Sequence, residues 1–252
     1  MSRAWILLLA FWPAFGQQPK NLQLFLLIGQ SNMAGRGEIG PEERKPVSDI
    51  WVQAQDLSWK PALDPLHYDK PAIVGVGIGR SFAQAVAAAH PGVSIGVIPA
   101  AFGGSALDEW QPGSRHYTEA VRRTRAALRH GQLAGILWHQ GEADSGSEAL
   151  ANSYASRFQK VIRQLRTDLA APRAPLVVGE LGRFFLARPN GAQYAGVVVE
   201  QLRSIPDLIP RAAFVSTEGL TDKCDTTHFD TRSLHELGRR YAAAFLRLEY
   251  KP

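Results

Sequence analysis

The feature that most constrains the fold is a series of short apolar segments, each followed by a stretch with helical periodicity. The first segment, residues 22–28, is apolar except at Gln23 and too short for a buried helix, so we interpret it as a buried parallel strand. Similar segments follow at residues 93–99, 133–138, 175–181 and 213–217. Helices are expected at residues 80–90, 117–130, 148–169, 192–203 and 233–248. This alternation predicts an α/β fold, with helices on both faces of a central parallel five-stranded sheet and right-handed crossovers.

The first sixteen residues, 1–16, have the layout of a secretory signal peptide. One early charge, Arg3, precedes an apolar run over residues 4–12, which is followed by Pro13 and by the small residues Ala14 and Gly16. We expect cleavage after Gly16 and a secreted or periplasmic protein; a retained N-terminal anchor is the alternative. The apolar run is too short to span a bilayer. Without a shift in composition or an internal repeat, residues 17–252 are expected to form one domain.

Charge and cysteine content argue against several other classes of protein. The formal net charge is +5, and part of it comes from arginines on one predicted helix, where a solvated face explains them: Arg122, Arg123, Arg125 and Arg129. Aromatic residues are not interleaved with them, as a nucleic-acid groove requires, so no nucleic-acid partner is expected.

Cys224 is the single cysteine, which rules out an internal disulfide. The seven histidines lack the spacing of metal ligands, so no metal is expected.

Polar residues follow three of the predicted strands. The first strand is followed by GQSN (29–32), the second by GGS (103–105) and the third by HQGE (139–142). A fourth polar loop, DTTH (225–228), precedes the last predicted helix. Because the carboxyl ends of parallel strands share one edge of a sheet, where α/β proteins bind ligands, we expect these residues to lie together.

These residues supply the parts that serine-based acyl transfer needs. Ser31 is a candidate nucleophile at the end of a rigid strand, although a serine there also caps helices, and taken alone that role is favoured. An aspartate three residues before a histidine reaches its Nδ1–H and leaves Nε2 free to face a serine. Asp225 and His228 therefore complete a predicted triad. A glycine such as Gly104 lets a backbone N–H approach a ligand closely.

Four motifs in this order resemble those of SGNH hydrolases in the sialate O-acetylesterase and acetylxylan esterase group, carbohydrate esterase family 6. They are GQSNMAG, GGS-x-x-x-x-W, WHQGE and D-x-x-H before a helix, within residues 24–245. The resemblance implies a three-layer α/β/α sandwich with a flavodoxin-like fold, and deacetylation of carbohydrate esters without a cofactor. It implies Ser31 as nucleophile, His228 as base and Asp225 as orienting acid. It also implies an oxyanion hole of the Ser31 and Gly104 backbone N–H groups and the Gln140 side-chain amide.

Several residues near these motifs keep more than one interpretation. Glu142 is expected at the site, where it binds His228, binds a substrate hydroxyl or braces the loop of Gln30. Gln30 and Asn32 are expected to shape the turn around the serine. Trp110 either lines a sugar subsite or packs in the core.

The proline-rich region 36–72 is expected to be irregular and to serve as a lid or binding wall. Its tryptophans either stack on sugar rings or pack the region onto the body of the protein. Asp222 and Asp230 are rival partners for His228, but the D-x-x-H spacing favours Asp225.

Together these observations favour a secreted serine esterase that removes O-acetyl groups from sialic acid or acetylated xylan-type glycans. An acetylated carbohydrate is the expected partner, with no metal, nucleic acid or membrane. A general short-chain SGNH esterase for lipid or aryl esters is one alternative. A carbohydrate-binding protein without catalysis is another, although binding alone would not require Ser31, Gln140, Asp225 and His228.

Overall fold

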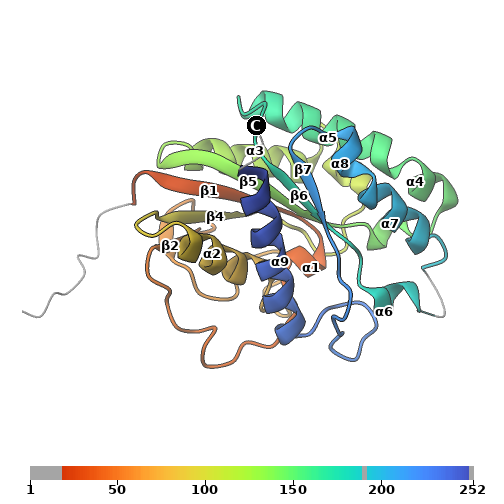
Figure 1. Ribbon diagram of the computed structural model, residues 1–252, viewed down its shortest axis with the longest axis horizontal. Coiled ribbons are helices and arrows are strands. Elements are labelled where there is room, and N and C mark those ends of the chain that lie inside the picture. Colours follow the sequence, from red (N-terminus) through yellow and green to blue (C-terminus); the bar gives the residue numbers. More distant parts are fainter. Residues whose placement is uncertain (1–18, 189–191, 250–252) are drawn as a thin grey trace, which may run out of the picture.

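The computed structural model describes residues 19–188 and 192–249. Its centre is a seven-stranded sheet with the strand order β3-β2-β4-β1-β5-β6-β7 (Figure 1). The strands are β1 (Leu22–Gly29), β2 (Ile50–Gln53), β3 (Trp59–Pro61), β4 (Ile95–Pro99), β5 (Gly131–His139), β6 (Leu176–Gly179) and β7 (Ala212–Val215). Neighbouring strands are parallel except for β2 and β3, which are antiparallel. The predicted signal peptide, residues 1–16, lies outside the described residues.

Helices cover both faces of this sheet, so the predicted three-layer α/β/α arrangement is confirmed (Figure 1). One face carries α2 (Ile78–Ala89) and α9 (Thr231–Glu249), and the other carries α3 (Arg115–Ala127), α5 (Tyr154–Asp168) and α7 (Ala195–Arg203). Shorter elements are α1 (Ser31–Ala34), α4 (Glu148–Asn152), α6 (Arg183–Leu186), α8 (Ile205–Leu208) and the 3-10 turns η1 (Leu107–Trp110) and η2 (Glu142–Asp144). The single helix predicted over 148–169 is divided at Ser153, whose hydroxyl donates to the Ala149 carbonyl.

The central strand β1 contributes to the apolar cores on both faces. Leu24 and Leu26 belong to the core under α3, α5 and α7, whereas Phe25 belongs to the core under α2 and α9. The Phe25 ring packs edge-on against Phe82 and against Phe245, with 4.9 Å between ring centroids in each pair. Because both faces of this strand are buried, apolar residues are needed at successive positions, which explains the apolar run in the sequence.

The predicted count of five strands is wrong, because β2 and β3 lie inside the region 36–72 that was expected to be irregular. β2 has four residues and β3 has three, and β3 includes Pro61. A proline is tolerated there because β3 is an edge strand, where a missing N–H need not break the sheet. The pairing of Ile50 with Ile95 is a tertiary contact that the local sequence does not encode.

The tryptophans of region 36–72 pack against the body of the protein. Trp59 is buried, and Trp51 is half-buried against the same apolar core. The Tyr68 hydroxyl donates to the carbonyl oxygen of Gln53 in β2 at 2.9 Å. These contacts favour the packing interpretation over stacking on sugar rings. Across the ranges 19–188 and 192–249, no helix is both long and apolar enough to cross a membrane.

Candidate active site

Ser31 lies where the central strand β1 turns into α1, at the carboxyl edge of the sheet (Figure 1). Gly29 permits this turn: its φ is +131°, and a Cβ there would lie 2.1 Å from the carbonyl oxygen of His139. Gln30 holds the cap position and Ser31 is the first helical residue, so the alternative that Ser31 merely caps the helix is wrong. Only 6% of Ser31 is exposed. The sequence thus places a nearly buried hydroxyl at the end of a rigid strand.

Asp225 and His228 form a hydrogen-bonded pair in the loop between β7 and α9. His228 Nδ1 lies 2.7 Å from Asp225 Oδ2. Asp225 Oδ1 accepts from the backbone N–H groups of Thr227 at 2.9 Å and His228 at 2.7 Å. Burial by itself would raise the pKa of the Asp225 carboxyl, but the hydrogen bonds from His228 and Thr227 outweigh it and lower that pKa. An ionised carboxylate here holds Nδ1 as the protonated ring nitrogen and leaves Nε2 as the basic one.

The rival carboxylates have other partners. Asp222 accepts from the backbone N–H of Thr226 at 2.7 Å. Asp230 accepts from the Thr221 hydroxyl at 2.5 Å and from the Ser233 backbone N–H at 2.7 Å. The structure therefore gives His228 the partner that the D-x-x-H spacing favours.

Glu142 lies against the residue that follows the serine, not against His228. Its Oε1 accepts from Asn32 Nδ2 at 2.6 Å, while its buried Oε2 has no protein partner within the described residues. Burial is the largest influence on Glu142 and raises the pKa of its carboxyl to about 7. Gln30 Oε1 accepts from the backbone N–H of Ala143 at 3.3 Å, so Gln30 also ties the serine turn to η2.

The loop after β4 presents a free backbone donor at Gly104. Gly104 has a φ of +83°, and neither its N–H nor that of Ser31 has a hydrogen-bond partner within the described ranges. The preceding N–H, of Gly103, donates to Asp69 Oδ2 at 2.8 Å. Asp69 in turn forms a buried ion pair with Arg36 Nη2 at 2.7 Å.

Sequence reasoning missed the roles of Arg36 and Asp69. Arg36 directly follows the motif GQSNMAG, which was a usable signal. Asp69 lies in the proline-rich region, and nothing in the sequence near it points to Gly103. Burial by itself would raise the pKa of Asp69, but the hydrogen bond from Arg36 leads the interactions that lower it. The pair fixes the loop that carries Gly104.

The structure corrects the predicted role of Gln140 as an oxyanion donor. Gln140 Nε2 donates to the Ser105 carbonyl at 3.0 Å and to Asp144 Oδ2 at 2.7 Å, so both amide hydrogens are used. Its Oε1 lies 2.7 Å from the Tyr154 hydroxyl, and the side chain is fully buried. The amide holds the loop after Gly104 from beneath and has no hydrogen left for a substrate.

The sugar-subsite alternative for Trp110 is also wrong. Trp110 is 1% exposed, and its Nε1 donates to Ser105 Oγ at 2.9 Å. Its ring packs edge-on against Trp138, with 5.4 Å between centroids. Trp110 therefore belongs to the core. His139 is likewise buried, with Nδ1 lying 3.0 Å from the Tyr241 hydroxyl, and burial lowers the pKa of its imidazole to about 3.

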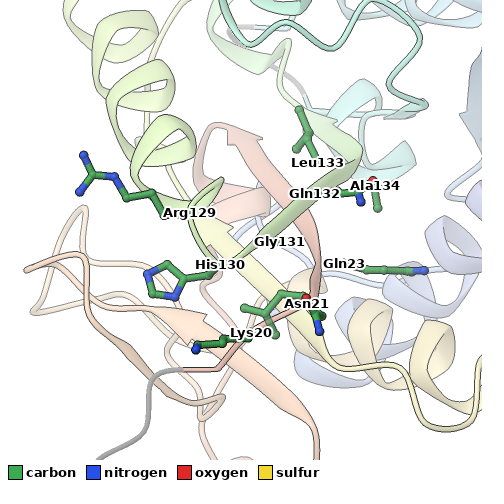
Figure 2. Close-up of a pocket in the computed structure, with 10 residues that line it drawn as sticks. Lys20, Asn21, Gln23, Arg129, His130, Gly131, Gln132, Leu133 and Ala134 are labelled. Carbon is green, nitrogen blue, oxygen red and sulfur yellow. The ribbon is translucent and has the colours of Figure 1, made fainter.

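A hollow of about 760 Å³ lies at the opposite edge of the sheet (Figure 2). It is bordered by Lys20 and Asn21, just before β1, and by Arg129 and His130, just before β5. These are the amino ends of parallel strands, so the hollow is separated from Ser31 by the length of the sheet. None of the predicted site residues lines it. In the part of the chain that the structure describes, no group of three or more His, Cys, Asp and Glu side chains is arranged to hold a metal ion.

Comparisons with known proteins show which family the chain belongs to. A family model described as carbohydrate esterase, sialic acid-specific acetylesterase, matches residues 21–247. A probable carbohydrate esterase of Arabidopsis thaliana is 34% identical over 247 residues, covering 90% of this chain and 91% of that protein. An X-ray structure of an Arabidopsis thaliana protein is similar with a TM-score of 0.82 at 33% identity, covering 91% of this chain and 99% of that one.

Two more distant structures share the fold. NanS has a TM-score of 0.77 at 19% identity, with 92% of this chain and 99% of that chain covered. A carbohydrate acetylesterase from Xanthomonas citri has a TM-score of 0.68 at 22% identity, with 90% of this chain and 57% of that chain covered. The match to the family model and the Arabidopsis relative place the chain in the class of carbohydrate esterases. Within that class, the chain belongs to the sialic acid-specific acetylesterase family of carbohydrate esterases.

Proposed function

We propose that the chain removes O-acetyl groups from a carbohydrate through an acyl-enzyme on Ser31, with His228 as base and Asp225 as its orienting acid. The observation that carries this proposal is the 2.7 Å contact between His228 Nδ1 and Asp225 Oδ2. The loop that holds this pair is hydrogen bonded to the residue next to Ser31, because Asn32 Nδ2 donates to the Thr227 carbonyl at 3.0 Å. A carboxylate, an imidazole and a nearly buried hydroxyl are the groups that acyl transfer requires.

In the first half-reaction, His228 Nε2 takes the proton of Ser31 as Ser31 Oγ bonds to the acetyl carbonyl carbon. The carbonyl electron pair moves to oxygen, and that oxyanion accepts hydrogen bonds from the backbone N–H groups of Ser31 and Gly104, which have no partner among the described residues. When the tetrahedral intermediate collapses, the bond to the sugar oxygen breaks, and that oxygen takes the proton from His228. Acetyl-Ser31 and the free sugar hydroxyl are the products.

The second half-reaction uses water in place of the sugar oxygen. His228 Nε2 takes a proton from water as its oxygen attacks acetyl-Ser31. Collapse expels Ser31 Oγ, which regains its proton from His228, and acetate leaves. Throughout, Asp225 accepts the Nδ1–H of His228 and stabilises the transient imidazolium. Two backbone N–H donors to Asp225 and its lowered pKa keep its carboxylate ionised for this role.

The family description supports acetylated sialic acid as the first substrate to test, and acetylated xylan-type glycans as the second. We also propose that the protein is exported, on the basis of the signal-like residues 1–16. Acetate is the acyl group expected in either substrate, so the site should reject long acyl chains.

Acetate release from a panel of esters tests this function. Wild type, Ser31→Ala and the exposed control Ser156→Ala are compared on 9-O-acetyl sialic acid, acetylated xylan and esters of longer acids. We expect Ser31-dependent release of acetate from at least one acetylated sugar, with Ser156→Ala equal to wild type. Preference for longer acyl chains would indicate a general esterase. Sugar binding without Ser31-dependent hydrolysis would indicate a binding protein.

A further inference from the structure

The side chain of Asn32 contacts the backbone on both sides of His228. Asn32 Oδ1 accepts from the backbone N–H of Phe229 at 3.2 Å. Asn32 Nδ2 donates to the carbonyl oxygen of Thr227 at 3.0 Å. Asn32 is 1% exposed and is bonded covalently to Ser31, so a single buried amide joins the serine turn to the histidine loop.

Glu142 determines which way that amide faces. Asn32 Nδ2 donates its second hydrogen to Glu142 Oε1 at 2.6 Å, so the oxygen and both amide hydrogens of Asn32 are used. The reversed amide would place its oxygen against two acceptors, Glu142 and the Thr227 carbonyl, and its nitrogen against the Phe229 N–H. Only one orientation of Asn32 therefore satisfies its surroundings.

The loop that carries His228 contains two residues with a strained backbone. Cys224 and Thr226 are not glycines, yet they have φ values of +68° and +55°. Such residues persist only where the surrounding structure holds them. Asn32 supplies contacts at positions 227 and 229, beyond the strained residues and on either side of the imidazole.

We propose that Asn32 is a positioning residue that holds the His228 imidazole in place relative to Ser31, and that Glu142 holds Asn32 in the required orientation. The inference rests on the proposed function and deepens it. It assigns Glu142 the bracing role among its three interpretations, with Asn32 as the partner. Because the residues on both sides of His228 are held, the imidazole needs no reorganisation before it takes a proton. A displacement of a catalytic group by about 1 Å can lower the rate by about 100-fold.

Steady-state kinetics on a chromogenic acetate test the role of Asn32. Asn32→Asp keeps the volume and one acceptor but replaces Nδ2 with an oxygen that faces Glu142 and the Thr227 carbonyl. We expect kcat to fall about 10- to 100-fold in Asn32→Asp and Asn32→Ala, with KM changed by less than about threefold, because only the placement of the base is lost. Gln53→Met, which removes a buried amide bonded to the Arg123 carbonyl, is the matched control and should keep its kcat.

The Glu142 variants separate positioning from general support of the fold. Glu142→Gln retains an acceptor oxygen for Asn32, so its kcat should stay within about fivefold of wild type. Glu142→Ala lacks that acceptor, so its kcat should fall about as far as that of Asn32→Ala. Backbone hydrogen exchange supplies a second readout, since the Phe229 N–H should lose protection in Asn32→Ala while the β1 amides keep theirs.

Two results would overturn the inference: an Asn32→Asp kcat within about twofold of wild type, or a loss confined to KM. Failure of the proposed function gives a different result, because wild type and Ser31→Ala would then hydrolyse the acetate equally. Failure of the inference requires an active wild type whose Asn32 variants keep their kcat.

Discussion

Asp144 Oδ2 accepts a hydrogen bond from Gln140 Nε2 at 2.7 Å, so the amide predicted to face a substrate faces a fully buried carboxylate. The same carboxylate accepts from the backbone N–H of Leu107 at 2.9 Å and from Arg157 Nη2 at 2.7 Å. These contacts link η1, η2 and α5 beneath the loop that carries Gly104. Asp144 is therefore the centre of a buried polar network.

Asp144→Ala should destabilise the protein strongly, because Arg157 Nη2, Gln140 Nε2 and the Leu107 N–H each lose a buried acceptor. Breaking a buried pair in this way costs about 3–5 kcal/mol in free energy of unfolding. Chemical denaturation measures the change. Asp108→Ala is the matched control: Asp108 also contacts Arg157, at 2.9 Å, but it is exposed, and its loss should cost less than about 1 kcal/mol. Equal effects of the two variants would contradict the network.

Asp69→Ala should lower kcat, because the Gly103 N–H then loses the acceptor that fixes the Gly104 loop. Disturbing one oxyanion donor typically costs about 100-fold in kcat. Asp69→Asn keeps an acceptor oxygen and should restore most of that rate. The exposed Asp56, in the same region, provides the control Asp56→Ala, which should match wild type in kcat. A normal kcat in Asp69→Ala would show that the Arg36–Asp69 pair does not position the donor.

Trp110→Phe should affect stability and not substrate affinity. The variant leaves Ser105 Oγ without its indole donor and a gap against Trp138, which together cost about 1–3 kcal/mol. KM for an acetylated sugar should stay within about twofold of wild type. Thermal or chemical denaturation and KM are measured on the same preparation. A raised KM at unchanged stability would restore the sugar-subsite interpretation.

Glu142 makes the free energy of unfolding depend on pH. Burial raises the pKa of the folded Glu142 carboxyl to about 7 from its ordinary value of 4.5, so between these pH values the folded state holds a proton that the unfolded state has released. Its contribution to stability is therefore present at low pH and is lost as pH rises from about 4.5 to 7. The difference amounts to about 3 kcal/mol.

Glu142→Gln removes this dependence. Its free energy of unfolding relative to wild type should increase by about 3 kcal/mol between pH 4 and pH 8, measured by urea denaturation. The exposed Glu148→Gln serves as the control and should show no such trend. A pH-independent difference for Glu142→Gln would contradict a raised pKa at this carboxyl.

Much of the fold could be predicted from the sequence because the strands of a doubly covered sheet need apolar residues on both faces. Residues 22–28 show this directly, with Leu26 in one core and Phe25 in the other. β2 was missed because its four residues have no apolar pattern that marks them as a strand. They form a strand because they pair with β4, for example Val52 with Val97.

In the active site, too, local contacts could be predicted from the sequence and tertiary contacts could not. The Asp225–His228 pairing could be predicted because it is local, three residues apart within one loop. The contacts of Gln140 and Asp69 could not, since their partners Asp144 and Gly103 are chosen by how the loops stack at the sheet edge. A motif identifies a side chain but does not show where its hydrogens are directed.

The most direct test of the account is the hydrolysis of a chromogenic acetate by wild type and by Ser31→Ala at matched concentration. Loss of an activated serine nucleophile should lower kcat by at least about 10³-fold, while Ser31→Ala keeps the wild-type midpoint of denaturation. Equal rates for the two proteins would contradict the central claim that Ser31 carries the acyl group.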